Sequence, residues 1–559
     1  MAAPPVNRRA SRLRADTEPL TSDVYGQLIS YHAHQGPHPT LHPGTIYQDL
    51  TQFLDGQRIL PRTRDEQTTG VCAYHGILLT FNRAGVRSQK PYTDARECAL
   101  AMQSRERDDP YSQILFLRGH TSPEWIKNTG AAWNVDPEFF NSTMLFRCRN
   151  LNSAYPSPPS SYPDIVRLPI VTIGRRDTGV TSRLLDKMRL STIEQLAEYQ
   201  HCLRQGKQVN LCDSIVRGLC VIDEQHFIIE QEVAVCVQLE TRKDGDKGWN
   251  ALISTDIANC LAEGASGGLN ACWMANMGSE FNASGTRFHS TVHHSKKIAF
   301  RSRHAENVVS DMRHRHDCRC SQTASLIPLN YGHQLDARAA SIDPLYAFSD
   351  LFRFVISTEN QLINLLSEFV NQETGLEALI AGKLSTSNLV YCERILDARI
   401  RKMRDILNWL KSRETSRWPK ITDGDTAFHK VKETINDLHV DFEHLLRSAE
   451  DLSKRYHTTM TAITNQAILA ESRQALSQGS HVARLTLVAS GFIPLSFTTS
   501  LFGMNVSQLG NGNPLPSIWA WVVVSVPLLA LTLAFCLWPV SPERHSGAIP
   551  ATRFTRVVR

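Results

Sequence analysis

The chain has 559 residues, of which 42% are hydrophobic, with a formal net charge of +5 and 13 cysteines. This length leaves room for two or three domains. An odd number of mostly isolated cysteines argues against a disulfide framework and favours a reducing compartment. The modest net charge gives no reason to expect a nucleic-acid partner.

Residues 1–44 are predicted to be a flexible N-terminal segment. The first twenty residues contain four arginines but no apolar stretch, which excludes a secretory signal. A mitochondrial presequence is the alternative, although Pro4 and Pro5 disfavour the amphipathic helix that it requires. The His- and Pro-rich stretch 35–44 is typical of a loop.

A mixed α/β domain is predicted for residues 45–280. Strand-like apolar runs occur at 114–117, 165–173, 227–240 and 251–254, and a helical pattern covers 192–203. In this domain, residues 264–268 match the G-x-S-x-G pattern of hydrolases, with Ser266 at its centre. That pattern needs a buried strand before it, whereas 255–263 resembles a short polar helix. We therefore expect a Gly-rich turn and no enzyme activity.

Residues 281–343 are predicted to be a basic insertion or linker. Its part 289–320 contains side chains of the types that bind zinc: His289, His293, His294, His304, His314, His316, Cys318 and Cys320. The spacing from His314 to Cys320 is too cramped for a usual tetrahedral site. A flexible basic loop is favoured over a metal site, and no regulatory metal ligand is assigned.

Helical periodicity dominates after Pro344. Residues 344–424 are predicted to form a helical bundle, and residues 425–481 a long stalk helix. Apolar residues of the stalk alternate spacings of four and three, as in a coiled coil: Val431, Ile435, Leu438, Phe442, Leu445, Ala449, Leu452 and Tyr456. The stripe then becomes polar toward Arg473. This change is typical of a helix whose first part packs in an apolar interface and whose second part lines a water-filled vestibule.

Two apolar runs of 23 residues, 482–504 and 518–540, are predicted to be transmembrane helices 1 and 2. A helix of this length covers about 34 Å, enough for a hydrocarbon core of roughly 30 Å. The outer loop 505–517 has no Lys or Arg, whereas the basic tail 541–559 has four Arg. We therefore expect both termini in the cytoplasm, with the plasma membrane favoured and the mitochondrial inner membrane as the alternative.

The first of these runs carries a stripe suited to lining a pore. Steps of three or four residues place one set on a single helical face: Val482, Leu485, Ala489, Ile493, Ser496 and Ser500. Hydroxyls can replace some of an ion's water contacts, and an aliphatic constriction can close by dewetting. Packing between membrane helices explains the same composition, and the composition alone favours packing. Because two helices cannot enclose a pore, transport requires a homo-oligomer.

The segment 485–505, LTLVASGFIPLSFTTSLFGMN, resembles the pore helix of the CorA metal-ion transporters. The resemblance includes the Phe-Ile-Pro-Leu segment and the terminal Gly503, Met504 and Asn505. It is specific because the tripeptide ends one apolar span and precedes a second, and it covers about residues 425–540. Segments 115–140 and 226–240 are similar, less specifically, to the N-terminal domain of fungal CorA-like proteins.

The resemblance implies an α+β membrane protein: a homopentameric channel with a cytoplasmic α/β funnel-type domain and a stalk helix that continues into the pore. Gly503, Met504 and Asn505 would form the entrance filter for passive Mg²⁺ transport. Ser496 would occupy a polar ring usually held by Thr, and Leu485 a hydrophobic gate. No catalytic residue and no cofactor are implied, since the divalent cation is the substrate.

This chain also departs from the family pattern. The loop after Asn505 is neutral where many members are acidic, Val482 stands where Met is common, and Gly479 stands where Asn can occur. Zn²⁺ or another divalent ion, or a non-conducting membrane-anchored scaffold, are therefore the alternatives. The sequence determines neither the ion nor the membrane, nor a role for 289–320.

Overall fold

The computed structural model describes residues 21–34, 44–56, 74–82, 84–85, 87–104, 111–144, 162–176, 182–204, 211–241, 247–258, 286–292, 322–373, 386–413, 418–503 and 518–537. The chain divides into two compact units, Met1–Thr458 and Thr459–Arg559.

Eight strands in the described part of unit 1 form one mixed sheet in the order β2-β1-β3-β7-β6-β4-β8, with β5 beside β6. Strands β3 and β7 are parallel, and the other pairs are antiparallel. The strands are β1 (Gly76–Asn82), β2 (Arg87–Tyr92), β3 (Tyr111–Arg118), β4 (Ile165–Arg176), β5 (Gly218–Val221), β6 (His226–Thr241), β7 (Lys247–Thr255) and β8 (Thr286–Phe288). The expected mixed α/β character is confirmed, and all four expected strand-like runs lie within strands.

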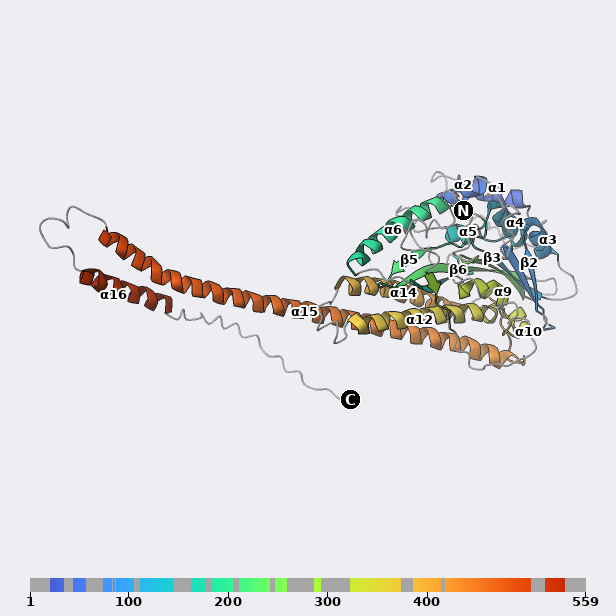
Figure 1. Ribbon diagram of the computed structural model, residues 1–559. Coiled ribbons are helices and arrows are strands. Elements are labelled where there is room, and N and C mark those ends of the chain that lie inside the picture. Colours follow the sequence, from blue (N-terminus) through green and yellow to red (C-terminus); the bar gives the residue numbers. More distant parts are fainter. Residues whose placement is uncertain are drawn as a thin grey trace, which may run out of the picture. The chain divides into compact units, whose positions relative to one another are not determined.

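Helices cover both faces of this sheet (Figure 1). One layer contains α1 (Ser22–Ala33), α2 (Gln48–Asp55), α3 (Ala95–Gln103), α4 (Pro123–Trp133) and α5 (Pro137–Met144), with the short helix η1 (Gly44–Tyr47) and with α6 (Ser182–Arg204) over β5. The other contains η6 (Thr323–Leu326), α9 (Ile327–Asn330), α10 (Ala337–Ile342), α11 (Pro344–Ala347), α12 (Ser349–Glu373), α14 (Thr386–Arg413) and the start of α15 (Phe428–Gly503).

The period-two alternation of the strands creates these two cores. In β1, Ile77 and Leu79 belong to the cluster shared with α12 and α14, whereas Leu78 belongs to the cluster shared with α1 to α5. Polar N-caps begin several of the helices. Asp94, for example, accepts hydrogen bonds from the backbone nitrogens of Arg96 and Glu97 at 2.9 and 2.8 Å, which begins α3.

The heptad stripe is the buried face of the first part of α15. Seven of its eight residues are buried and Ile435 packs against the same core. These residues pack against other helices of the same chain. For example, the Tyr456 hydroxyl donates to the Leu366 carbonyl of α12 at 2.9 Å. The more polar continuation of the stripe is exposed at Gln466, Ala470 and Arg473, as expected. The predicted boundaries at residues 280, 343 and 424 stay predictions.

A buried ion pair ties this helical layer to the sheet. Arg399 of α14 and Glu359 of α12 are both fully buried, and the guanidinium contacts both carboxylate oxygens of Glu359. Glu230 of β6 lies 3.5 Å from Arg399 and also receives a hydrogen bond from Lys402 at 2.9 Å. Two helices and the longest strand therefore share one charged cluster.

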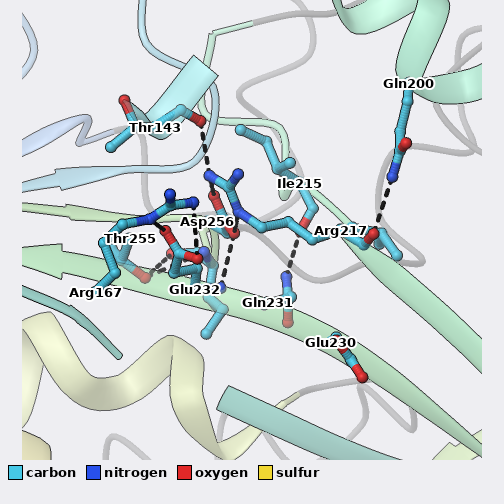
Figure 2. A network of polar contacts seen from close by, with 12 residues as sticks. Thr143, Arg167, Gln200, Ile215, Arg217, Glu230, Gln231, Glu232, Thr255 and Asp256 are labelled. Carbon is cyan, nitrogen blue, oxygen red and sulfur yellow. Dashed lines mark hydrogen bonds and ion pairs between the residues drawn. The ribbon is translucent and has the colours of Figure 1, made fainter. Parts of the chain in front are cut away.

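A second buried cluster holds the strands themselves together (Figure 2). Arg217, which precedes β5, donates twice to Asp256, which follows β7, at 2.6 and 3.0 Å. Asp256 also accepts from the backbone nitrogen of Glu232 in β6 at 2.7 Å, and Arg217 donates to the Thr143 carbonyl at 2.7 Å. Each charge thus has partners, which a buried charge requires.

Replacing Arg399 with Met should strongly destabilise unit 1, because it leaves the Glu359 carboxylate buried without its counter-charge. Loss of one partner of a buried pair costs about 3–5 kcal/mol, which denaturant unfolding of the detergent-solubilised protein would measure. Arg404→Met is the matched control on the same helix, because its partner Glu450 is exposed. Equal unfolding midpoints for both variants would show that the buried pair contributes little.

Asp343 makes the stability of unit 1 pH-dependent. It caps α11 through the backbone nitrogen of Tyr346 at 3.1 Å, and burial raises the pKa of its carboxyl to about 6. Because the folded-state pKa is raised, the folded form binds the proton more tightly, and stability is lost as pH rises from about 4 to about 6. Asn caps a helix equally well but cannot ionise. At pH 8, the free energy of unfolding of Asp343→Asn should therefore exceed that of the wild type by up to about 3 kcal/mol. At pH 3.5 the two proteins should have the same free energy of unfolding. Denaturant unfolding at both pH values measures this difference.

Asp94→Asn, at the exposed N-cap of α3, is the control for Asp343→Asn. Because this side chain is exposed, the substitution should not raise the stability at pH 8 above that of the wild type. A profile for Asp343→Asn that parallels the wild type between pH 4 and 7 would contradict the assignment.

Candidate ion pathway

The last part of α15 is one of two apolar helical segments in the described part of the chain. Among the described residues, α15 is the one helix long and apolar enough to cross a membrane by length and composition. Helix α16 (Ile518–Leu537) has no charged residue over its 20 residues, but its apolar stretch Trp521–Thr532 falls short of that criterion. The structure thus supports one candidate span, and a second span stays a prediction.

The six residues of the predicted pore stripe lie on one face of α15, and all six are exposed in the single chain. Leu485 and Ile493, in the aliphatic part, retain 76% and 68% of their accessible surface. Large apolar side chains in water would be unfavourable by about 1.5–3 kcal/mol each relative to burial. This face therefore suits either lipid or other copies of the chain.

Helix α16 packs on the opposite face of α15. Thr498 and Ser525 are 1% and 3% exposed, and the Ser525 hydroxyl donates to Thr498 Oγ1 at 2.9 Å. Pro494, one turn before Thr498, is buried as well. On a helical projection, Pro494 and Thr498 lie about 130–170° from the centre of the stripe. The contact with α16 thus leaves the stripe uncovered.

Most hydroxyls in this part of α15 are satisfied within the helix. Thr486 donates to the Val482 carbonyl at 2.9 Å, Ser490 to Leu487 at 2.8 Å, and Thr499 to Leu495 at 2.9 Å. Such bonds to the preceding turn are how Ser and Thr satisfy their polar groups in apolar surroundings. The hydroxyls of Ser496 and Ser500 make no hydrogen bond to the described part of the chain. These two stripe residues can therefore offer oxygen to a ligand.

Each of the two apolar helices contains a proline. Pro494 in α15 and Pro527 in α16 lack the backbone N–H that would bond the carbonyl four residues earlier. In α15 this frees the Ser490 carbonyl from its helical donor. Prolines at such positions bend helices, and the sequence places this bend between the aliphatic and the hydroxyl-bearing parts of the stripe.

Only the first residue of the predicted entrance filter is described. Gly503 ends α15, and a Cβ added there would meet no heavy atom within 4 Å. Met504 and Asn505 lie outside the described residues. Gly503 thus has no close packing role within the described part of unit 2.

The other candidate sites of the sequence lie wholly or mostly outside the described residues. The Ser266 pattern lies outside the described residues, and of segment 289–320 only residues 289–292 lie within them. No group of three His, Cys, Asp or Glu side chains in the described residues is arranged to hold a metal ion. Residues 293–320, which include seven of the eight His and Cys candidates, lie outside the described residues.

The comparison with protein-family models matches residues 345–541 to "CorA-like Mg2+ transporter protein". This range begins in α11 and contains α12, α14, α15 and α16. Residues 345–541 are thus similar to the CorA-like family. The expected resemblance is confirmed there, and the CorA-like region reaches further toward the N-terminus than residues 425–540.

The solved structures that align with this chain include two of low similarity. The complete structure of the CorA magnesium transporter from Methanocaldococcus jannaschii aligns at 11% identity and a TM-score of 0.31, covering 82% of this chain and 96% of that one. The full-length CmaX protein aligns at 9% identity and a TM-score of 0.32, with the same coverage. Comparison with curated proteins gives no match. The assignment of the CorA-like region therefore rests on its sequence match.

The hydrogen bond between Ser525 of α16 and Thr498 of α15 was not predicted from the sequence. An almost wholly apolar run such as 518–540 is typical of a helix that faces lipid on all sides. Ser525 breaks that pattern, and a hydroxyl inside an apolar span was the available signal that one face of α16 is packed.

Replacing both Thr498 with Val and Ser525 with Ala tests this contact by a double-mutant cycle. Hydroxyl bonds between membrane helices are worth about 0.5–2 kcal/mol, so the coupling energy should fall in this range when measured by unfolding in detergent. Thr499→Val is the control partner for Ser525→Ala, because Thr499 bonds only within α15. A coupling as large for Thr499 as for Thr498 would contradict the contact.

Proposed function

We propose that this protein carries divalent cations, Mg²⁺ foremost, passively across a membrane through a pore built from several copies of the chain. The CorA-like match over residues 345–541 supports divalent cation transport as the function. The observation that carries the pore is the stripe on α15, which is exposed along its whole length while α16 covers Pro494 and Thr498 on the opposite side.

In the proposed assembly, copies of α15 surround the pore and α16 lies outside this ring as the second membrane span. Two helices from one chain cannot enclose a pathway, so a symmetric homo-oligomer is required. A pentamer, with unit 1 and both termini in the cytoplasm, agrees with the resemblance and with the basic C-terminal tail. Residues 518–540 would complete the second span.

The proposed pathway has three chemical zones. Val482 and Leu485 would form an aliphatic gate, which closes when it loses water. Ser496 and Ser500 would offer hydroxyl oxygens, consistent with their lack of hydrogen bonds in the described chain. Asn505 would form the entrance ring, with Gly503 and Met504 beside it.

Amide and hydroxyl oxygens suit an ion that keeps its hydration shell. Mg²⁺ dehydrates reluctantly and is usually bound with several of its waters. The stripe and the outer loop contain no carboxylate, so the pathway has no site that would strip and trap the ion. Hydrogen bonds from bound waters to Asn505 and the serines would instead guide a hydrated cation.

Replacing Asn505 with Ala should reduce Mg²⁺ entry into vesicles that contain the purified protein to the level of empty vesicles. The entrance would then lack the amide oxygens that accept hydrogen bonds from the hydrated ion. A Mg²⁺-sensitive dye inside the vesicles measures the flux. Asn513→Ala is the matched control, because it makes the same substitution in the same neutral loop, and it should conduct like the wild type.

Flux measurements in the same vesicles distinguish Mg²⁺ transport from Zn²⁺ transport and from a non-conducting scaffold. Wild-type flux of Zn²⁺ that exceeds that of Mg²⁺ would change the proposed ion and keep the pathway. Unchanged Mg²⁺ flux in Asn505→Ala would refute the entrance ring. Absence of any divalent flux in a wild-type oligomer verified by chemical cross-linking would identify a non-conducting scaffold.

A further inference from the structure

Helix α15 carries a compact polar patch on one side, where its apolar part begins. The patch consists of Ser477, Ser480, His481 and Arg484, whose spacing places them on one side of the helix, and all four are exposed. The Ser480 hydroxyl donates to the Ser477 carbonyl at 2.7 Å. The donors that this patch can offer to a ligand are therefore the Ser477 hydroxyl, the His481 imidazole and the Arg484 guanidinium.

The charge of this polar patch has no acid near it along the chain. No Asp or Glu occurs between Glu471 and Glu543. On the turn that follows Arg484, the nearest side chains of the helix are Leu487 and Val488, which are apolar. The potential at the patch is therefore positive, and it favours an anion.

The same side of α15 becomes apolar directly after the patch. Val488, Gly491 and Leu495 continue from Arg484 in steps of four, three and four residues, and we call them the apolar strip. Val488 is 57% exposed, and a Cβ added at Gly491 would meet no heavy atom within 4 Å. A residue without a side chain lets a partner approach the helix backbone closely. One side of the helix thus offers a polar patch followed by an open apolar strip.

This side of α15 differs from the proposed pore stripe. On a helical projection, the polar patch is centred about 120° from Val482 and Leu485, the stripe residues at the same level of the helix. It lies between the stripe and the side where Pro494 and Thr498 are buried. A ligand on the patch and strip therefore leaves the stripe uncovered.

The order of the two surfaces indicates what kind of anion fits. Guanidinium groups bind phosphate oxygens through paired hydrogen bonds. A soluble phosphate would use only the polar patch, whereas a phospholipid has a phosphate followed by apolar chains. Arg484 lies near the start of the proposed span 482–504, where a long basic side chain reaches the interface. Anionic lipids of the cytoplasmic leaflet attract basic residues beside a span.

We propose that an anionic phospholipid binds this side of α15, with its phosphate at the polar patch and one acyl chain along the apolar strip. The inference rests on the membrane placement of α15 in the proposed function. It does not depend on conduction, because binding is measured without a transported ion.

Isothermal titration of the full-length protein in uncharged detergent at low salt tests the polar patch. The probes are dioctanoyl phosphatidylglycerol, which is anionic, and dioctanoyl phosphatidylcholine, which has the same chains and no net charge. The wild type should bind the anionic lipid more tightly. Arg484→Gln should weaken binding of the anionic lipid about tenfold, because one charge-assisted contact is lost.

Arg473→Gln is the matched control for Arg484→Gln. It makes the same substitution at an exposed arginine on the same side of α15, about 16 Å closer to the start of the helix. It should bind the anionic lipid like the wild type. Glycerol 3-phosphate, the probe for a soluble phosphate, should bind far more weakly than the lipid.

Gly491→Leu tests the apolar strip. The new side chain would fill the open step, so binding of dioctanoyl phosphatidylglycerol should weaken several-fold. Leu is a better helix former than Gly, so the helix itself should not be weakened. Gly424→Leu is the control, because this glycine of unit 1 also has open space around its Cβ position. Circular dichroism and chemical cross-linking verify that all variants fold and assemble like the wild type.

Four results would overturn the proposal. They are equal affinity of the wild type for the two lipids, equal weakening by Arg484→Gln and Arg473→Gln, glycerol 3-phosphate binding as tightly as the lipid, and unchanged affinity in Gly491→Leu. Lipid binding as expected in a protein that shows no divalent flux would support the lipid site and refute the proposed transport, so the two failures are distinguishable.

Discussion

Helix α15 lies in two different environments along its length: a protein core in its first part, and lipid or other copies of the chain in its last part. Its first part buries the heptad residues from Val431 to Tyr456 in the core of unit 1, and its last part exposes an apolar stripe that water would disfavour. The helix runs from Phe428 to Gly503 with a proline at Pro494 near its end, so the two surroundings are matched mainly by the choice of side chains. The CorA-like region, the contact with α16 and the proposed pore all depend on this helix.

The beginning of α15 has a firm anchor because the layer that receives it is joined to the sheet by charge as well as by apolar packing. Arg399 links α12, α14 and β6, and the Arg217–Asp256 pair links the start of β5 and the end of β7 to the middle of β6. Buried ion pairs add little net stability, but they penalise other arrangements of the same elements, because a misplaced partner leaves a buried charge uncompensated. We infer that these pairs fix which helix meets which strand.

The proposed pathway on α15 avoids charge. It consists of neutral oxygens and aliphatic groups, which suits a cation that must leave as readily as it enters. Its chemistry follows from the geometry of the helix, because steps of three and four residues place the aliphatic and hydroxyl side chains on one face.

The sequence by itself determined the elements whose signal is local. Periodicity revealed the heptad face of α15, the apolar runs and the stripe, and the Gly503, Met504, Asn505 ending pointed to the CorA-like family that the match over 345–541 confirms. Only the tertiary structure decided which surfaces meet. The heptad face of α15 packs on α12 of the same chain. Ser525 of α16 donates a hydrogen bond to Thr498 of α15, and Arg175 of β4 pairs with Arg287 of β8. These pairings join residues distant in sequence, so no periodicity within a single segment encodes them.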